Sequence, residues 1–296
     1  MDSRTAALIE QFGNYPTTAQ LLKVMTRQQL DVHVSNGRLT RIWYGVYATA
    51  EQDLRGRLAA LDVFMGGGPA IACLGTAAAL YGFDSENTAD IHVLDPGVRM
   101  RPTKGLVVHQ RWGAPLQLIG SRPATAPAWT AVEVARRLRR PRGLATLDAA
   151  LRSTWCTEVD LEQAVRDQRG RRGIVAVRAL LAHADPRAES AMESEARLVM
   201  LDHGLPRPEL QYTVMGRSGE RWRVDFAWPQ ARVAAEYESV DWHAGRSAML
   251  RDKSRFSGVQ DAGWTIIPIV VDDVRRNPAR LAERIARQLD RSQLAG

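Results

Sequence analysis

Lysine is nearly absent from this chain of 296 residues, since Lys23, Lys104 and Lys253 are its only lysines and arginine carries almost all of the positive charge. Cysteine is equally scarce, and Cys73 and Cys156 are too few for a disulfide framework or a four-cysteine zinc site. No apolar run approaches the roughly 18–20 residues that cross a bilayer, and the first residues lack a signal-peptide pattern. We therefore expect a cytoplasmic protein without membrane contacts.

The composition is that of a folded protein with an excess of positive charge. With 45% hydrophobic and 25% charged residues, the chain resembles an ordinary globular protein, and its length suits two or three compact units. Forty basic against 33 acidic residues give a net charge of +7. This balance favours a polyanionic partner, and nucleic acid first. The arginine-rich run 136–142 ends a predicted helix, and it is either a solvated helix end or a phosphate-binding patch.

Residues 1–50 predict helices followed by a β-hairpin. Thr17 or Thr18 can cap one helix, and Thr26 can cap a second that ends at Asn36-Gly37. The stretch 38–47 is rich in β-branched and aromatic residues around Gly45, which suits the wing of a winged-helix DNA-binding domain. A small domain of this kind can also mediate protein contacts. The side chains expected to reach DNA are those of Gln28, Gln29, His33, Arg38 and Arg41.

The same segment resembles the N-terminal winged-helix domain of AbiEi-type antitoxins of type IV toxin–antitoxin systems. The resemblance is carried by Thr17-x-x-Gln20-Leu21-Leu22, Gly37-Arg38-Leu39-x-Arg41 and Gly45-Val46-Tyr47. It implies promoter binding and repression, with a cognate toxin protein as a possible partner. Residues 51–185 resemble the continuation of such proteins more weakly. In this middle α/β region we expect a helix over 70–81 and strands over 90–94 and 106–109, with His92 and His109 as structural residues.

From residue 186 the pattern predicts the order α-β-β-β-α-β-α. The strands are expected near 210–214, 222–228, 233–238 and 264–271. If Pro229-Gln230 closes a two-residue hairpin, Asp225 faces Ala234 and Glu236 lies on the adjacent diagonal, about 7–8 Å away between backbones. Two such carboxylates can share a hard divalent cation, Mg²⁺ or Mn²⁺ rather than zinc. Glu193 and His243 can converge on the same place.

This last segment resembles the PD-(D/E)XK nuclease superfamily, and within it the domains related to very-short-patch-repair endonucleases. The matching elements are Ser190-x-x-Glu193, Gly204-Leu205-Pro206-x-Pro208-x-x-Gln211, Arg223-Val224-Asp225-Phe226, Glu236-Tyr237-Glu238-Ser239-x-x-Trp242-His243, Arg251-Asp252-x-x-Arg255 and Gly263-Trp264. The resemblance implies a restriction-endonuclease-like αβββαβ core over 186–296. It also implies Asp225 and Glu236 as Mg²⁺ ligands, Glu193 as an assisting acid and His243 as a general base or acid.

One position departs from the nuclease pattern. Glu238, which we include in the catalytic set, stands where the superfamily has a lysine, and a carboxylate there repels the attacked phosphate. Arg251 and Arg255 are four residues apart on a predicted helix, and they can bind phosphate or pair with nearby acids.

Three functions are consistent with these residues. The leading interpretation is a DNA-binding protein whose metal-dependent endonuclease-like domain hydrolyses phosphodiesters in defence, repair or plasmid control. The alternative is a non-catalytic type IV antitoxin-like transcriptional regulator with a degenerate nuclease core. A third is a binding module without a regulatory target. The sequence indicates no oligomeric state. Convergence of Asp225, Glu236 and a third ligand on one point separates the first interpretation from the second.

Overall fold

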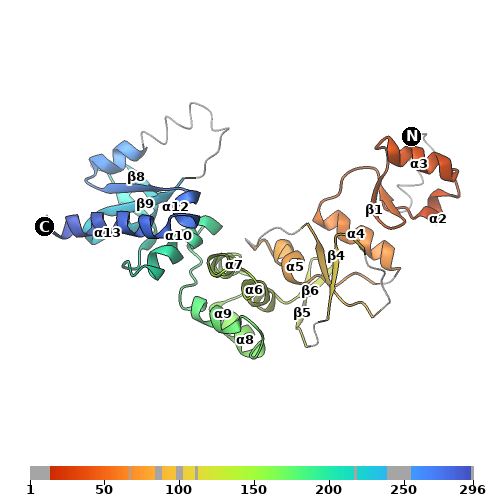
Figure 1. Cartoon of the computed structure of the whole chain (residues 1–296), viewed down its shortest axis with the longest axis horizontal. Coiled ribbons are helices and arrows are strands. Elements are labelled where there is room, and N and C mark those ends of the chain that lie inside the picture. Colours follow the sequence, from red (N-terminus) through yellow and green to blue (C-terminus); the bar gives the residue numbers. More distant parts are fainter. Residues whose placement is uncertain are drawn as a thin grey trace. The chain divides into compact units, whose positions relative to one another are not determined.

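The computed structural model describes residues 14–66, 68–83, 89–97, 103–110, 113–216, 219–238 and 255–294 (Figure 1). The chain divides into two compact units. The first contains residues 1–80 and 87–130, and the second contains residues 81–86 and 131–296. Helices and small sheets occur in both, which confirms the predicted mixed α/β fold class.

The first unit begins with two short helices and a hairpin, as the cap residues predicted. Thr17 caps α2 (Thr18–Leu21), and Thr26 caps α3 (Arg27–Ser35). Gly37 follows α3 with a φ of 72°, a conformation that glycine adopts without strain. Strands β1 (Thr40–Trp43) and β2 (Val46–Ala48) then pair antiparallel across a turn at Tyr44-Gly45. Any helix before residue 14 lies outside the described residues.

The remainder of the first unit is a small α/β core. It contains α4 (Leu54–Met65), α5 (Leu74–Tyr81), the parallel pair β3 (Ile91–Leu94) and β4 (Leu106–His109), and the antiparallel pair β5 (Leu116–Ile119) and β6 (Arg122–Thr125). Both predicted strands are present. The expected helix over 70–81 begins only at Leu74, because Ala72 is extended and bridges Val93 on one side and Ala124 on the other.

Four helices follow β6. Helix α6 (Pro127–Ala135) spans the division at residue 130, and α7 (Arg140–Arg152), α8 (Glu158–Asp167) and α9 (Ile174–Leu181) lie in the second unit. Every residue of α7 from Gly143 to Leu151 is buried, because the helix packs against both α9 and α10 (Ala191–Asp202). Helix α7 is therefore the centre of this unit and not a peripheral connector.

The C-terminal part has the element order that the sequence predicted. Helix α10 is followed by β7 (Glu209–Met215), β8 (Arg221–Trp228), β9 (Val233–Tyr237), a helical stretch over 255–261, β10 (Thr265–Ile269), α12 (Val271–Arg275) and α13 (Pro278–Leu294). The sheet order is β10-β9-β8-β7, with β10 parallel to β9 and the other pairs antiparallel. One face of the sheet carries a core cluster that includes Phe226, Trp228, Ile267, Leu281 and Ile285.

The register between β8 and β9 differs from the expected one by two residues. Phe226 pairs with Ala235 and Trp228 with Val233, whereas a two-residue turn would have paired Asp225 with Ala234. The turn is longer because Pro229–Ala231 form a 3-10 turn and Arg232 adopts a left-handed φ of 48° before β9 begins. Extended by one residue beyond Phe226 and Ala235, the observed register places Asp225 opposite Glu236.

The expected division of the chain at residues 50 and 185 stays a prediction about independent domains. In the structure, residues 131–185 pack together with the C-terminal sheet in a single unit. The side chains of Arg197 and Asp148 form a fully buried ion pair of 2.6 Å between α10 and α7. This pair and the α7 to α10 packing connect the residues on the two sides of Asp185-Pro186.

Candidate DNA-binding surface and carboxylate cluster

Reciprocal capping boxes fix the two helices of the N-terminal segment. Gln20 Oε1 accepts the Thr17 N–H at 2.7 Å, and Gln29 Oε1 accepts the Thr26 N–H at 2.8 Å. Each threonine hydroxyl accepts the N–H three residues ahead in return. These bonds satisfy donors that a helix start leaves open, and they hold the short turn that separates α2 from α3.

The outer face of α3 is exposed and polar. Arg27, Gln28 and Asp31 are exposed, and Arg27 lies 3.8 Å from Asp31 in an exposed ion pair. Gln29 is exposed as well, but its side-chain oxygen is used in the cap, so only its amide nitrogen remains for a ligand. His33 is half-buried. Of the two glutamines expected to reach DNA, Gln28 is therefore the one whose side chain is not used in the helix cap.

The hairpin after α3 presents two cations and an aromatic ring. Arg38 and Arg41 are exposed, and the Tyr44 side chain at the turn is 65% exposed. The Arg41 guanidinium lies 4.6 Å from the centre of the Tyr44 ring, a cation–π arrangement. Trp43 is buried, and its indole N–H donates to the Arg57 carbonyl of α4 at 2.9 Å, which anchors the hairpin.

Lys104 joins this surface from a distant part of the sequence. With Thr103 it lines a shallow hollow of about 310 Å³ against hairpin residues 41–44. Sequence reasoning did not select Tyr44 or Lys104. Tyr44 could have been selected from its place beside Gly45 in the predicted hairpin turn. No neighbouring residue in the sequence indicated that Lys104 lies beside the hairpin.

Three of the five arginines in the run at 136–142 pair with acids of the protein. Arg136 pairs with Glu133 at 3.2 Å, Arg142 with Glu195 at 3.4 Å, and Arg140 with Asp202. For these three arginines the geometry favours a structural helix end, because their guanidinium groups already contact carboxylates, whereas Arg137 and Arg139 are exposed.

Three of the predicted catalytic acids lie close together in the C-terminal part. Glu193 is in the first turn of α10, where its Oε2 accepts the Glu189 N–H at 2.8 Å and the Gln211 amide at 2.9 Å. Asp225 Oδ2 accepts the Tyr237 N–H at 2.9 Å. Glu236 is 3% exposed, and its Oε2 lies 2.6 Å from Arg255 Nη2. The acids are thus near one another but each already has protein partners.

Burial sets the protonation tendencies of this cluster. Loss of water raises the pKa of Glu193, and the negative charge of Asp225 raises it further, although the Glu189 N–H opposes the shift. Loss of water also raises the pKa of Asp225, against the opposing Tyr237 N–H and the Arg255 charge. The cluster therefore disfavours full ionisation, and Arg255 supplies the nearest compensating charge.

The cluster does not have the ligand arrangement expected of a divalent metal site. In the part of the chain that the structure describes, no three His, Cys, Asp or Glu residues are grouped so that they could hold one ion. Arg255, for which the sequence left phosphate binding and pairing with an acid open, contacts Glu236, and Glu238 is exposed after the end of β9. His243 and Arg251 belong to residues 239–254, which lie outside the described ranges.

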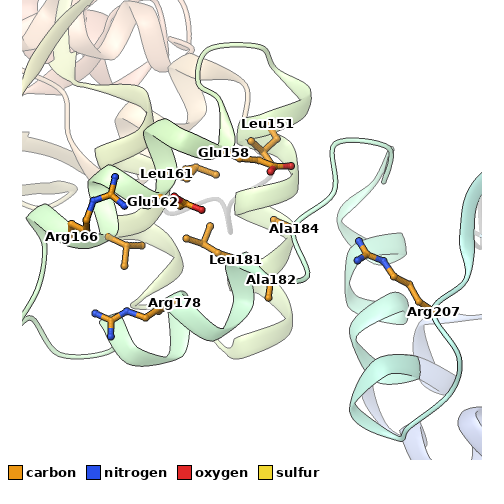
Figure 2. A pocket seen from close by; sticks show the side chains of 11 residues that line it. Leu151, Glu158, Leu161, Glu162, Arg166, Arg178, Leu181, Ala182, Ala184 and Arg207 are labelled. Atoms are coloured by element: carbon orange, nitrogen blue, oxygen red, sulfur yellow. Dashed lines mark ion pairs between the residues drawn. The ribbon is translucent and has the colours of Figure 1, made fainter.

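A hollow lies elsewhere in the second unit, against helices α8 and α9. It measures about 580 Å³, with Leu151, Leu161, Val165 and Leu181 among its apolar lining. Figure 2 shows Glu158, Glu162, Arg166 and Arg178 around it on α8 and α9, with Arg207 on a separate loop. Glu162 and Arg166 pair at 3.6 Å, so the rim offers mixed charge without a preference for either sign.

Comparison with known proteins identifies the middle of the chain. Residues 70–183 match the family model of the AbiEi antitoxin C-terminal domain, which confirms the weaker of the two antitoxin resemblances. The comparisons give no support for a nuclease-family domain, and the resemblance of residues 1–50 stays a prediction. The structure of protein RV2827C from Mycobacterium tuberculosis matches with a TM-score of 0.40 and 17% identity, over 61% of this chain and 80% of that one.

Two curated relatives match almost the full length. They are the uncharacterized proteins MT2308 and Rv2248 of Mycobacterium tuberculosis, from strains CDC 1551 and H37Rv. Each is 73% identical over 272 residues, which cover 92% of this chain and the whole of each relative. None of the described helices is long and apolar enough to cross a membrane. The chain belongs to the family of MT2308 and Rv2248, and its residues 70–183 match the AbiEi antitoxin C-terminal domain.

Proposed function

We propose that the protein is a DNA-binding transcriptional regulator of the antitoxin type. The observation that carries the proposal is the order of its parts, since a capped helix pair and an exposed basic hairpin precede the residues that match an AbiEi antitoxin domain. The net charge of +7 supports a polyanionic partner. The DNA ligand is expected to include the region upstream of its own gene, and a toxin encoded beside it is a candidate partner.

Helix α3 and the hairpin are the proposed contact elements. In helix-turn-helix proteins the N-terminal residues of the second helix contact base edges in the major groove. Gln28 occupies this position, and a glutamine amide can form two hydrogen bonds with the edge of an adenine. Arg38 and Arg41 are suited to phosphate contacts, while Tyr44 holds the Arg41 guanidinium in place.

Binding to two duplexes tests this proposal. We expect the purified protein to bind DNA from upstream of its gene more tightly than a scrambled duplex of equal length. Gln28→Ala should weaken binding to the upstream sequence by about 1–3 kcal/mol and affect the scrambled duplex little. Arg41→Ala should weaken both. Arg166→Ala, which removes an exposed arginine of α8, is the matched control. Equal binding of all four proteins to both duplexes contradicts the proposal.

Metal-dependent DNA hydrolysis is the second candidate, because the C-terminal element order and the neighbouring Glu193, Asp225 and Glu236 match the pattern of a nuclease core. Mg²⁺ or Mn²⁺ would be its cofactor. The described residues do not fit such an ion, since no three ligating side chains among them converge on one point and the Arg255 guanidinium already compensates the charge of Glu236. We therefore favour the regulator and derive no cleavage step.

A cleavage assay separates these two candidates. The protein is incubated with single-stranded, nicked and mismatched DNA in the presence of Mg²⁺, Mn²⁺ or EDTA, beside Asp225→Ala as the control. We expect no cleavage and the same midpoint of thermal unfolding with and without metal. Metal-dependent cleavage by the unmodified protein that is lost in Asp225→Ala would establish the nuclease instead.

A further inference from the structure

Helix α13 lies at the C-terminal end of the chain (Figure 1). It carries an arginine stripe, which comprises Arg280, Arg284, Arg287 and Arg291. At about 100° per residue, the offsets of 4, 7 and 11 residues place all four side chains within one narrow arc of the helix. Leu281, Ile285 and Leu289 lie on the opposite side and are buried in the core. The stripe therefore faces away from the protein interior.

The charges of the stripe are mostly left without acidic partners. Arg284 pairs with Asp273 at 3.0 Å, and Arg287 Nε donates to the Glu283 backbone carbonyl at 3.3 Å. Arg280 and Arg291 are exposed, and no ion pair found within the described ranges includes Arg280, Arg287 or Arg291. In the run at 136–142, three of the five arginines pair with acids. In the stripe, Arg284 is the one member with an acidic partner among the described residues.

We propose that the arginine stripe of α13 binds the phosphate backbone of DNA as a second contact surface, separate from α3 and the hairpin. The inference rests on the proposed DNA-binding function. The stripe spans about 16 Å at 1.5 Å per residue, a length over which one DNA strand carries about five phosphates. A lipid surface is a poorer partner, because the apolar face that would enter it is already buried in the core.

The salt dependence of binding tests the stripe. The variant R280Q/R287Q/R291Q removes three exposed charges that have no acidic partner, and R166Q/R169Q/R178Q removes three exposed charges from the region of α8 and α9 as the matched control. Affinity for the upstream and scrambled duplexes is measured at several salt concentrations. Each lost phosphate contact lowers the slope of log K against log salt by about 0.9. We expect a slope smaller by about 2.7 for the stripe variant on both duplexes and an unchanged slope for the control.

Several outcomes overturn the inference. If the unmodified protein binds neither duplex, the proposed function fails and the stripe proposal fails with it. If the unmodified protein binds and the stripe variant keeps the full slope, only the stripe proposal fails. A decrease in slope of the same size in the control variant also contradicts the stripe proposal, because the change in net charge would then be the cause. R280K/R287K/R291K should restore the slope, and the thermal midpoint of every variant should match the unmodified protein.

Discussion

At the scale of single residues, the ion pair of Arg197 and Asp148 is the most deeply buried charge interaction described. Both side chains are fully buried, and Arg197 also donates to the His183 carbonyl. A buried charge that loses its partner cannot recover its hydration, so removal of one member costs far more than removal of an exposed pair.

We predict that Asp148→Ala lowers the free energy of unfolding by about 3–5 kcal/mol. Arg140→Gln, which breaks the partly exposed pair with Asp202, should cost less than about 1 kcal/mol. Urea unfolding followed by circular dichroism measures both changes. Similar losses for the two variants would contradict the idea that burial decides the cost.

The stacked histidines of β3 and β4 predict a pH effect. His92 Nδ1 and His109 Nε2 are 2.8 Å apart, so one nitrogen must be an unprotonated acceptor. Burial lowers the pKa of His92, although the charge of Asp90 opposes the shift. A histidine with a lowered pKa contributes stability that is present above its ordinary pKa of about 6.5 and is lost as pH falls below it. The unfolding free energy should therefore decrease from pH 7 to pH 5.

His92→Gln should flatten this dependence, because the titrating group is removed. Urea unfolding at pH 5, 6 and 7 measures the slope in both proteins, and His183→Gln is a control at a histidine outside the pair. An unchanged slope in His92→Gln would show that His92 is not responsible.

At the scale of helices and strands, local signals predicted the N-terminal segment well. Thr26 and Gln29 are three residues apart, so the capping box that starts α3 is contained in a tetrapeptide. The predicted length of the turn between β8 and β9 was wrong, because the residue type of Arg232 does not predict its left-handed conformation. The turn is two residues longer than expected, and this shifted the register of the two strands by two residues.

We predict that Thr26→Ala destabilises the first unit by about 1 kcal/mol, because it removes the acceptor for the Gln29 N–H. Thr26→Ser keeps the hydroxyl and should cost less. The midpoint of thermal unfolding and the affinity for the upstream duplex measure the effect on stability and on DNA binding. A loss in Thr26→Ser as large as in Thr26→Ala would contradict the role of the hydroxyl.

At the scale of the whole molecule, the second unit should tolerate a cut at residue 131 better than one at residue 186. A fragment of residues 186–296 lacks Asp148 and Arg142, so Arg197 loses its carboxylate partner and Glu195 loses one of its arginines. We expect residues 131–296 to unfold cooperatively in a thermal scan, and residues 186–296 to lack a cooperative transition. A cooperative transition in the shorter fragment would support the domain boundary expected from the sequence.

The sequence by itself determined the fold class, the capped helices, most strands and the element order of the last part. These features depend on residues a few positions apart, so the pattern of neighbouring residue types predicts them. Only the tertiary structure decided that Glu236 pairs with Arg255, 19 residues away. It also decided that Arg142 and Arg140 pair with acids of α10, while Arg280, Arg287 and Arg291 of α13 have no ion pair among the described residues. Whether a charge is available to a ligand depends on what packs beside it, and packing joins residues that are distant in the chain.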